Sequence, residues 1–426
     1  MQAQACAAGQ LRGLGILRPR TGQERSRAGL QCVTSSMPDY SYLIVGGGMT
    51  ADAAAQAIRA ADPRGSIGLV STDPHPPYDR PPLSKALWKG EPEDKIWRKT
   101  DATGAVLHLG RRVTGIDPRG KRATDESGET YGYGKLLLAT GGTPRRLKLD
   151  TEQIIYFRTY DDYRRLHALA QEQLRFAVLG GGFIGSEIAA ALRMAGREVV
   201  MLVPEDGIGA RVYPADLSHS LNDYYRAKGV DLRTGEGLAG LTPRGGKVIV
   251  RTTSGKDLPV DVVVAGLGIA PNVDVAEQAG VHVENGIVVD ELLRTDVPDI
   301  YAAGDVANFF SPALGTRVRV EHEDNANAMG AAAGRSMAGQ GEPYHHLPFF
   351  YSDLFERGYE AVGELDARLE SFSDWKDPFK EGVIYYLKGG RVRGVLLWNV
   401  WGKVDEARTL IAEPGPLVAE SLRGRL

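Results

Sequence analysis

The same succession of strand, glycine turn and helix occurs twice in the chain. The first copy is YSYLIVGGGMTADAAAQAIRAAD, residues 40–62, and the second is RFAVLGGGFIGSEIAAALRMAG, residues 175–196. A further apolar strand follows each copy, at residues 66–72 and 198–205. Such units build doubly wound parallel sheets, because the helix returns the chain to start a second strand beside the first. The repeat therefore predicts an α/β fold with two sheets of this kind.

The spacing of the glycines predicts what the turns bind. Residues 46–51 match G-x-G-x-x-A, an accepted variant of the dinucleotide-binding pattern, and residues 180–185 match G-x-G-x-x-G in full. Glycine lets the backbone approach a pyrophosphate, which the amide groups of the helix N-terminus then bind. A single match is a weak signal, because glycine turns are common. Two matches in the same context predict two bound dinucleotides.

An acidic residue after the second unit bears on the choice of coenzyme. Glu205 lies 20 residues beyond Gly185, at the end of the next strand. A carboxylate at this point accepts hydrogen bonds from ribose hydroxyls and repels a 2′-phosphate, which favours NADH. Arg211 follows six residues later, and a nearby arginine can accommodate a 2′-phosphate. NADPH is therefore not excluded.

Bulk properties limit the classes of function. The chain has 426 residues and a formal net charge of −3, which gives no electrostatic case for a nucleic-acid partner. No apolar run approaches the roughly 18 residues of a membrane span. The two cysteines, Cys6 and Cys32, form no CxxC pair, and no zinc spacing occurs, so no metal site is predicted. Redox chemistry would have to use a bound cofactor instead of a protein dithiol.

The first 36 residues differ from the rest of the chain. They contain five arginines and one acidic residue. We interpret them as a disordered leader or an extension upstream of a start at Met37, in a cytoplasmic protein. An arginine-rich, acid-poor leader is also typical of a transit peptide, so a mitochondrial or other organellar location is the alternative.

Seven ordered motifs now point to a family: VGGGMTADAAA, PPYDRPPLSK, LLLATGGTPR, VLGGGFIGSEIAAAL, GLGIAPN, IYAAGDV and VEHEDNA. The set resembles FAD-dependent pyridine nucleotide oxidoreductases, in the group of ferredoxin reductases, rubredoxin reductases, monodehydroascorbate reductases and apoptosis-inducing factor. The C-terminal stretches FFYSDLFERGYEAVGELD and GVLLWNVWGK resemble the apoptosis-inducing factor branch, without its long C-terminal insertion. The resemblance extends over about residues 39–408.

The resemblance implies a domain organisation. Residues 37–152 and 271–340 would form an FAD-binding domain, split by an NAD-binding domain at residues 153–270. Residues 341–426 would form a C-terminal α+β domain, where Gly389-Gly390 between two apolar runs predicts a hairpin.

The resemblance also implies a reaction. Hydride would pass from NADH to the flavin, and electrons would go on to an iron–sulfur protein such as ferredoxin or rubredoxin, to a quinone or to another acceptor. The alternative is a slow-turnover NADH-binding flavoprotein that acts as a redox sensor through a charge-transfer complex and homodimerisation.

Four residues are implied in catalysis. Lys85 would lie against the flavin ring and pair with Glu187, Phe183 would stack on the nicotinamide, and His322 would line the flavin. From the residues alone, Glu187 also fits a first-turn acid favoured by the helix dipole, and Phe183 also fits a core aromatic. YDRPPLSK, residues 78–85, is predicted to be a stiff loop because its prolines fix φ and remove backbone donors. From these residues alone it fits a surface turn with solvated charges; the resemblance implies instead that it aims Arg80 and Lys85 at the cofactor.

The remaining predicted cofactor contacts combine the residues of the two glycine turns, Glu205 and Arg211 with positions that only the resemblance implies. They are Gly46, Gly48, Met49, Thr50, Ala51, Thr72, Arg80, Trp97, Val113, Thr140, Gly141, Arg145, Gly181, Gly182, Ile184, Glu205, Arg211, Gly268, Asp305, Glu321, Tyr351, Glu360 and Asn399. Two positions depart from the family pattern. Thr72, with Asp73 beside it, replaces the acid expected at the FAD ribose, and Tyr351 replaces a common tryptophan. His345 and His346 lie outside every motif and are interpreted as surface residues.

Overall fold

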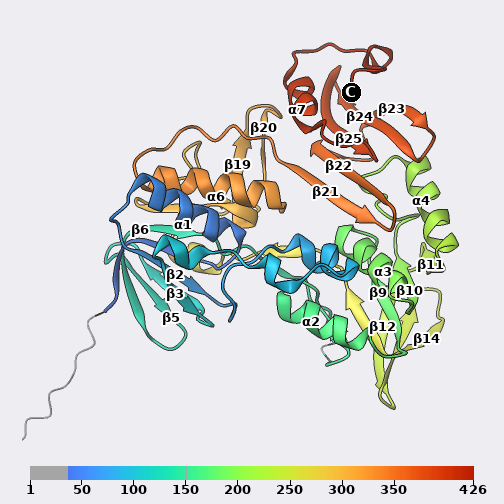
Figure 1. The fold of residues 1–426 in the computed structure, drawn as a ribbon, viewed down its shortest axis with the longest axis horizontal. Helices are drawn as coiled ribbons and strands as arrows, with labels where there is room; N and C mark the ends of the chain where they lie inside the picture. Colours follow the sequence, from blue (N-terminus) through green and yellow to red (C-terminus); the bar gives the residue numbers. More distant parts are fainter. Residues whose placement is uncertain (1–36, 150) are drawn as a thin grey trace, which may run out of the picture. The chain divides into compact units, whose positions relative to one another are not determined.

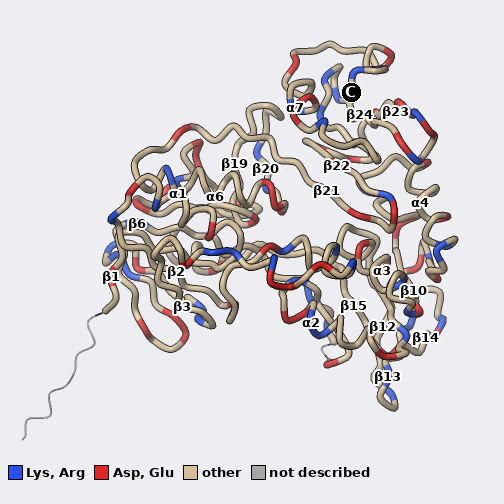
Figure 2. The backbone as a smooth tube through the Cα atoms, in the orientation of Figure 1, with Lys and Arg blue, Asp and Glu red and all other residues tan. Residues whose placement is uncertain are grey.

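The structure is a computed structural model that describes residues 37–149 and 151–426. The predicted leader, with Cys6 and Cys32, lies outside the described residues. Among the described residues, no helix is long and apolar enough to cross a membrane. Figure 2 shows Lys and Arg interspersed with Asp and Glu along the described chain.

The first strand–turn–helix unit forms part of a seven-stranded sheet with the order β3-β2-β1-β6-β5-β4, in which β18 also pairs with β6. Strands β1, β2, β3, β6 and β18 are parallel, while β4 and β5 form an antiparallel extension. The strands are β1 (Asp39–Val45), β2 (Ile67–Ser71), β3 (Val106–Leu109), β4 (Val113–Asp117), β5 (Arg122–Asp125), β6 (Thr130–Leu138) and β18 (Ile300–Ala302).

Helix α1 (Met49–Ala61) lies beside α6 (Glu323–Met337) on this sheet (Figure 1). The two helices approach closely because α6 carries glycines at the crossing. A Cβ atom at Gly330 would lie 2.4 Å from the Thr50 carbonyl oxygen, and one at Gly334 equally close to that of Ala54. Segments about 280 residues apart thus pack together in one unit around this sheet.

The second unit forms a parallel five-stranded sheet with the order β11-β10-β9-β15-β8. Its strands are β8 (Ile154–Ile155), β9 (Arg175–Leu179), β10 (Glu198–Val203), β11 (Asp231–Thr234) and β15 (Val262–Ala265). Its helices are α2 (Tyr160–Leu169), α3 (Phe183–Met194) and α4 (Ala215–Ala227). An antiparallel sheet accompanies it, formed by β12 (Leu238–Arg244), β13 (Lys247–Thr252) and β14 (Asp257–Val260).

The apolar run at residues 262–270 contains two strands, β15 and the start of β16 (Ile269–Pro271). After β15 the chain turns through Gly268, which has φ +76° and therefore a left-handed conformation that favours glycine. The chain then enters β16, which pairs with β7 (Gly142–Pro144). This two-stranded ladder links the two dinucleotide-type units.

The C-terminal part has a different architecture. Its antiparallel five-stranded sheet has the order β21-β22-β25-β24-β23, and helix α7 (Val404–Ala412) packs against it. The strands are β21 (Phe349–Leu354), β22 (Arg357–Gly363), β23 (Glu370–Asp377), β24 (Glu381–Lys388) and β25 (Arg391–Trp398). The hairpin predicted at Gly389-Gly390 joins β24 to β25, and both glycines have positive φ. The α/β fold with a C-terminal α+β part is confirmed.

The short remaining elements connect these parts. They are η1 (Pro81–Ser84), η2 (Ala86–Lys89), η3 (Glu93–Ile96), η4 (Thr100–Thr103), α5 (Asp274–Gln278), β17 (Ile287–Val288), η5 (Gly304–Val306), β19 (Ala307–Ser311), β20 (Thr316–Val318) and η6 (Ala419–Leu422).

Candidate functional site

A cavity of about 1290 Å³ reaches from the first glycine turn to the second and on to β21. Most of the predicted site residues line it. They are Gly46, Gly48, Met49, Thr50, Thr72, Arg80, Lys85, Val113, Thr140, Gly141, Gly182, Phe183, Ile184, Glu187, Gly268, Asp305, Glu321, His322 and Tyr351. Folding therefore gathers residues from many separated segments of the chain around one space.

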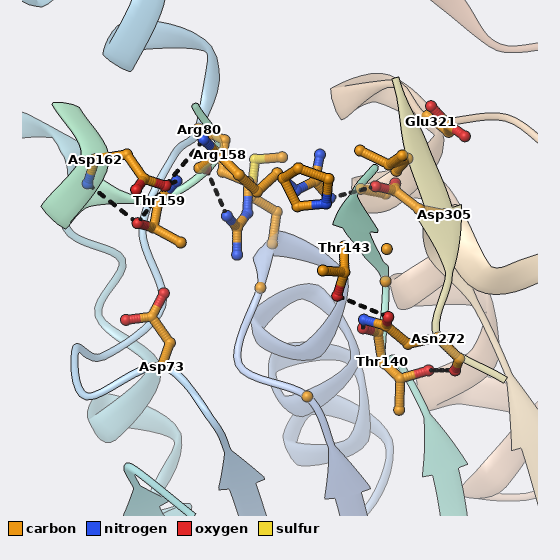
Figure 3. Close-up of a pocket in the computed structure, with 18 of the residues that line it drawn as sticks. Asp73, Arg80, Thr140, Thr143, Arg158, Thr159, Asp162, Asn272, Asp305 and Glu321 are labelled. Atoms are coloured by element: carbon orange, nitrogen blue, oxygen red, sulfur yellow. Dashed lines mark hydrogen bonds and ion pairs between the residues drawn. The ribbon is translucent and has the colours of Figure 1, made fainter. Parts of the chain in front are cut away.

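Two arginines, Arg80 and Arg158, lie close together on the cavity wall (Figure 3). Arg80 donates a hydrogen bond from Nη1 to the carbonyl oxygen of Arg158, at 2.9 Å, and Arg158 pairs with Asp305 at 2.7 Å. Burial, together with the neighbouring charge of Arg158, lowers the pKa of Arg80. Two partly buried guanidinium groups held side by side favour the binding of an anion.

The first glycine turn faces this charge. Gly48 precedes α1, and the atom nearest to a Cβ built on it would be Nη2 of Arg80, at 4.0 Å. Open space, helix amides and a partly buried guanidinium together fit the pyrophosphate of FAD. Beyond the turn, Thr72 is exposed and lines the cavity, whereas the Asp73 carboxylate accepts hydrogen bonds from Tyr78 Oη and the His75 amide.

A second wall of the cavity is fixed by a small hydrogen-bond network, visible in Figure 3. Thr140 Oγ1 donates to the Asn272 carbonyl at 2.7 Å, and Asn272 Nδ2 donates back to the Thr140 carbonyl at 2.9 Å. Thr143 Oγ1 donates to Asn272 Oδ1 at 2.8 Å. These bonds hold the β7 turn against the residues that follow β16.

The predicted Lys85–Glu187 ion pair is present. Lys85 Nζ lies 2.8 Å from Glu187 Oε2, and the two side chains are 11% and 2% exposed. Ser84 donates to the same oxygen at 2.5 Å, and Ser352 donates to Glu187 Oε1 at 2.6 Å. The ammonium of Lys85 also lies 5.2 Å from the ring centre of Tyr351. The pair joins the proline-rich loop, helix α3 and strand β21 at one buried carboxylate.

Aromatic rings line the cavity near this pair. Phe183 is 36% exposed at the start of α3, and its ring centre lies 5.1 Å from that of Phe350. A core aromatic would be buried, so the exposure of Phe183 favours a ligand-facing role over a packing role. His322 stacks on Phe350 with ring centres 4.2 Å apart. Burial lowers the pKa of His322 to about 4, although Asp305 and Asp324 oppose the shift, so the imidazole is neutral near pH 7.

The second glycine turn also has the geometry for a dinucleotide. Gly180 has φ +100°, and a Cβ on Gly185 would lie 2.1 Å from the Gly180 carbonyl oxygen, so the turn requires glycine at both positions. A Cβ on Gly182 would meet nothing within 4 Å, which leaves room for a phosphate at the N-terminus of α3. Glu205 pairs with Arg211 at 2.5 Å, and the Arg211 side chain is 85% exposed.

Eight predicted residues do not line the cavity: Ala51, Trp97, Arg145, Gly181, Glu205, Arg211, Glu360 and Asn399. Ala51 is fully buried in α1, and a Cβ on Gly181 would meet Val203 of β10, so both serve packing of the turns. Arg145 is exposed and does not line the cavity, whereas the next residue, Arg146, does. The guanidinium of Arg146 lies 4.5 Å from the ring centre of Tyr156.

Three of these residues have other contacts. Trp97 packs edge-on against Tyr78 and Tyr160, with ring centres 5.7 and 5.0 Å away. Asn399 accepts a hydrogen bond from the Gly358 amide, and Glu360 accepts one from the Gly402 amide. Glu360 nevertheless lies directly across the β21–β22 ladder from Tyr351.

The surface interpretation of His346 is wrong. It is half-buried and pairs with Asp324 at 2.5 Å, because Arg408 of α7 and the start of α6 meet there.

Sequence reasoning missed several residues of the site, among them Ser84, Arg158, Phe350 and Ser352. Arg158 stands before a helix whose capping box, Thr159 with Asp162, is visible in the sequence. That signal marks a helix start, and it does not reveal that the arginine points into a cavity. The two serines became recognisable only once Glu187 was placed between them.

Comparisons with known proteins agree with this geometry. The family model described as pyridine nucleotide-disulphide oxidoreductase matches residues 40–330. The chain belongs to this family. A second model, described as the C-terminal part of apoptosis-inducing factor, mitochondrion-associated, matches residues 371–413.

The similar proteins include an apoptosis-inducing factor and ferredoxin reductases. The chain is 33% identical to apoptosis-inducing factor 1, mitochondrial, of Dictyostelium discoideum, over 87% of this chain and 78% of that protein. It is 36% identical to the 5,5′-dehydrodivanillate O-demethylase ferredoxin reductase subunit of a Sphingobium species, over 88% and 94%. A solved covalent putidaredoxin reductase–putidaredoxin complex matches with a TM-score of 0.83 and 30% identity, over 90% and 95%.

The family membership and these relatives establish the general activity. The protein is an FAD-dependent NAD(P)H oxidoreductase of the ferredoxin reductase and apoptosis-inducing factor-like group. The first glycine turn with the partly buried Arg80 and the second turn at α3 each have space and donors that fit a dinucleotide phosphate. Although the family name includes disulphide chemistry, the chain has only two cysteines, both before residue 37.

Proposed function

We propose that the protein transfers electrons from NADH to a ferredoxin-type iron–sulfur protein. The observation that carries the proposal is the single cavity that joins both glycine turns and contains the Lys85–Glu187 pair. The ferredoxin reductase relatives support the choice of acceptor. Rubredoxin or a quinone would fit the same chemistry, and they are outcomes of the test below.

We assign a separate role to each part of the chain that surrounds the cavity. Residues 37–152 and 271–340 bind FAD, residues 153–270 bind the nicotinamide coenzyme, and residues 341–426 cover the flavin. When bound, FAD supplies the redox chemistry, exchanging two electrons with a nicotinamide and single electrons with an iron–sulfur centre.

The chain's own residues bind and orient the reactants. Arg80, Arg158 and the amides before α1 neutralise the FAD pyrophosphate. Phe183, which projects from α3 into the cavity, supports the nicotinamide ring. Tyr351 and the neutral His322 exclude water from the flavin edge and carry no charge there.

Lys85 has the electrostatic role. Reduction adds electron density to the flavin, and a fixed ammonium nearby stabilises that density. Glu187 holds the ammonium by the 2.8 Å ion pair and limits its movement. We expect Lys85→Ala to lower the midpoint potential of the bound FAD and to slow its reduction by NADH. An unchanged potential and rate would refute this role.

We also propose that NADH is preferred over NADPH. The support is Glu205, whose carboxylate can accept hydrogen bonds from the ribose hydroxyls of NADH. Arg211 already neutralises part of that charge through the 2.5 Å ion pair, so the preference should be moderate.

Anaerobic titration of the purified protein with NADH, and separately with NADPH, tests the function. Rapid bleaching of the flavin by NADH, followed by fast reoxidation with a [2Fe–2S] ferredoxin, supports the proposal. Reoxidation by rubredoxin or a quinone but not by ferredoxin would replace the acceptor. Faster bleaching by NADPH would overturn the coenzyme preference.

A second function has one observation in its favour, the match of residues 371–413 to the C-terminal model of apoptosis-inducing factor. It is an NADH-binding redox sensor with slow turnover. A long-wavelength absorbance band that persists in air after NADH addition, together with dimer formation on a sizing column, would favour this function over the reductase.

A further inference from the structure

Glu187 is held by more than the lysine that it pairs with. The side chain is 2% exposed, and both carboxylate oxygens accept hydrogen bonds from serine hydroxyls. Ser84 reaches Oε2 at 2.5 Å and Ser352 reaches Oε1 at 2.6 Å. Both serines are buried, with 6% and 1% of their surface exposed.

The three partners of Glu187 come from two other parts of the chain. Ser84 ends η1, and Lys85 follows it directly. Glu187 lies in α3, next to the second glycine turn, and Ser352 lies in β21 of the C-terminal sheet. Because Ser352 is the donor to Oε1, the C-terminal sheet controls the orientation of a carboxylate that belongs to the coenzyme-binding unit.

We propose that Ser84 and Ser352 are positioning residues that clamp the Glu187 carboxylate and thereby fix Lys85. With Oε1 held by Ser352, rotation of the carboxylate about its terminal bond is blocked. Oε2 then stays where Ser84 and the ammonium of Lys85 both reach it. The ammonium is held between this oxygen and the ring of Tyr351, 5.2 Å from the ring centre. This inference rests on the proposed role of Lys85 and adds two residues to it.

Loss of either hydroxyl has a defined consequence. Without Ser352, Oε1 is left buried without its serine donor, and the carboxylate can rotate to find another partner. Lys85 then follows the carboxylate or loses the ion pair. A cation that samples several positions stabilises the reduced flavin less than one that is fixed.

The test uses the FAD-loaded full-length protein and two measurements. One is the midpoint potential of FAD without coenzyme, and the other is the rate of flavin reduction by NADH in a stopped-flow instrument. We expect Ser352→Ala and Ser84→Ala each to slow reduction about tenfold. Both should shift the potential in the same direction as Lys85→Ala, by a smaller amount. Ser352→Thr retains the hydroxyl and should restore the rate to within about twofold of the parent protein.

Ser336→Ala is the matched control. Ser336 is also buried, but its hydroxyl donates to the Leu292 carbonyl at 2.8 Å and does not line the cavity. A purely structural role predicts that the clamp variants and this control lower stability alike and leave the potential unchanged. If Ser352→Ala does not fold, Ser84→Ala tests the same carboxylate from its other oxygen.

A double-mutant cycle separates the clamp from the role of Lys85. In a Lys85→Ala background, Ser352→Ala should cause no further shift of the potential, since the group it positions is gone. If Lys85→Ala shifts the potential and the serine variants behave like Ser336→Ala, the clamp is refuted and the role of Lys85 stands. If Lys85→Ala itself has no effect on the potential, the proposed role of Lys85 fails, and the clamp fails with it.

Discussion

His322 shows how one buried residue makes stability depend on pH. Burial lowers the pKa of His322 to about 4; Lys85 acts in the same direction, while Asp305 and Asp324 act against it. In an unfolded chain, histidine has a pKa near 6.5. Between these values the unfolded state takes up a proton that the folded state does not bind.

The sign of the effect follows directly. Stability contributed by a neutral His322 is fully present above about pH 6.5 and is lost as the pH falls towards about 4. We expect this one group to remove roughly 2 kcal/mol over that window, allowing for its partial exposure. Urea unfolding at about pH 7 and about pH 5 measures the loss, and His322→Gln should reduce it. Identical pH dependence in both proteins would contradict the assignment.

Arg80 should matter for FAD affinity more than for folding. Its guanidinium is partly buried, faces the first glycine turn, and forms no salt bridge with a carboxylate among the described residues. We expect Arg80→Ala to weaken FAD binding roughly 10- to 100-fold, because a charge-assisted contact to phosphate is lost. Fluorescence titration of the apoprotein with FAD measures this. Arg335→Ala, an exposed arginine of α6, is the control and should bind FAD normally.

At the scale of elements, the glycines of the second turn divide by function. A Cβ at Gly185 collides with the Gly180 carbonyl at 2.1 Å, whereas one at Gly182 meets nothing within 4 Å, and the backbone φ of Gly182 is −80°. Gly185 therefore serves the packing of α3 on its strand, and Gly182 keeps space for a ligand.

This contrast predicts opposite effects of two similar substitutions. Gly185→Ala should lower the free energy of unfolding by about 2 kcal/mol or more, as expected for overpacking. Gly182→Ala should leave the unfolding transition nearly unchanged and weaken NADH binding about tenfold. Thermal melts and coenzyme titration distinguish them. Unfolding of the Gly182 variant at the same lowered temperature as the Gly185 variant would show that both glycines serve packing.

At the scale of the whole molecule, Arg408 joins the C-terminal part to the FAD-type unit. From α7 it donates to the Leu347 carbonyl at 2.9 Å and to Asp324 at the start of α6 at 3.2 Å. His346 completes the group through its 2.5 Å contact with Asp324. This cluster fixes the segment that leads into β21, and β21 carries Tyr351 and Ser352.

We expect Arg408→Ala to destabilise the protein by about 1–2 kcal/mol, because Asp324 loses one of its partly buried partners. Amide exchange should increase in β21, and FAD should remain bound. Hydrogen exchange with mass spectrometry gives both readouts. Exchange that increases only within α7 would show that the arginine stabilises its own helix and does not fix β21.

The sequence by itself determined the repeated dinucleotide-binding units and the hairpin at Gly389-Gly390. These features depend on local steric rules: a turn that needs positive φ selects glycine, and an apolar run of strand length between turns must be buried. Family resemblance added Lys85, Glu187, Phe183 and His322, whose placement in one cavity agrees with what it implied.

Only the tertiary structure decided which side chains share that cavity. Ser84 and Ser352 are separated by 268 positions, yet they contact the same carboxylate. Arg146 lines the cavity, whereas the adjacent Arg145 does not. Serines and arginines satisfy many environments equally well, so their type and spacing carry little information about their partners. Those partners are set by how α3, the proline-rich loop and β21 pack together, which is a long-range property of the folded chain.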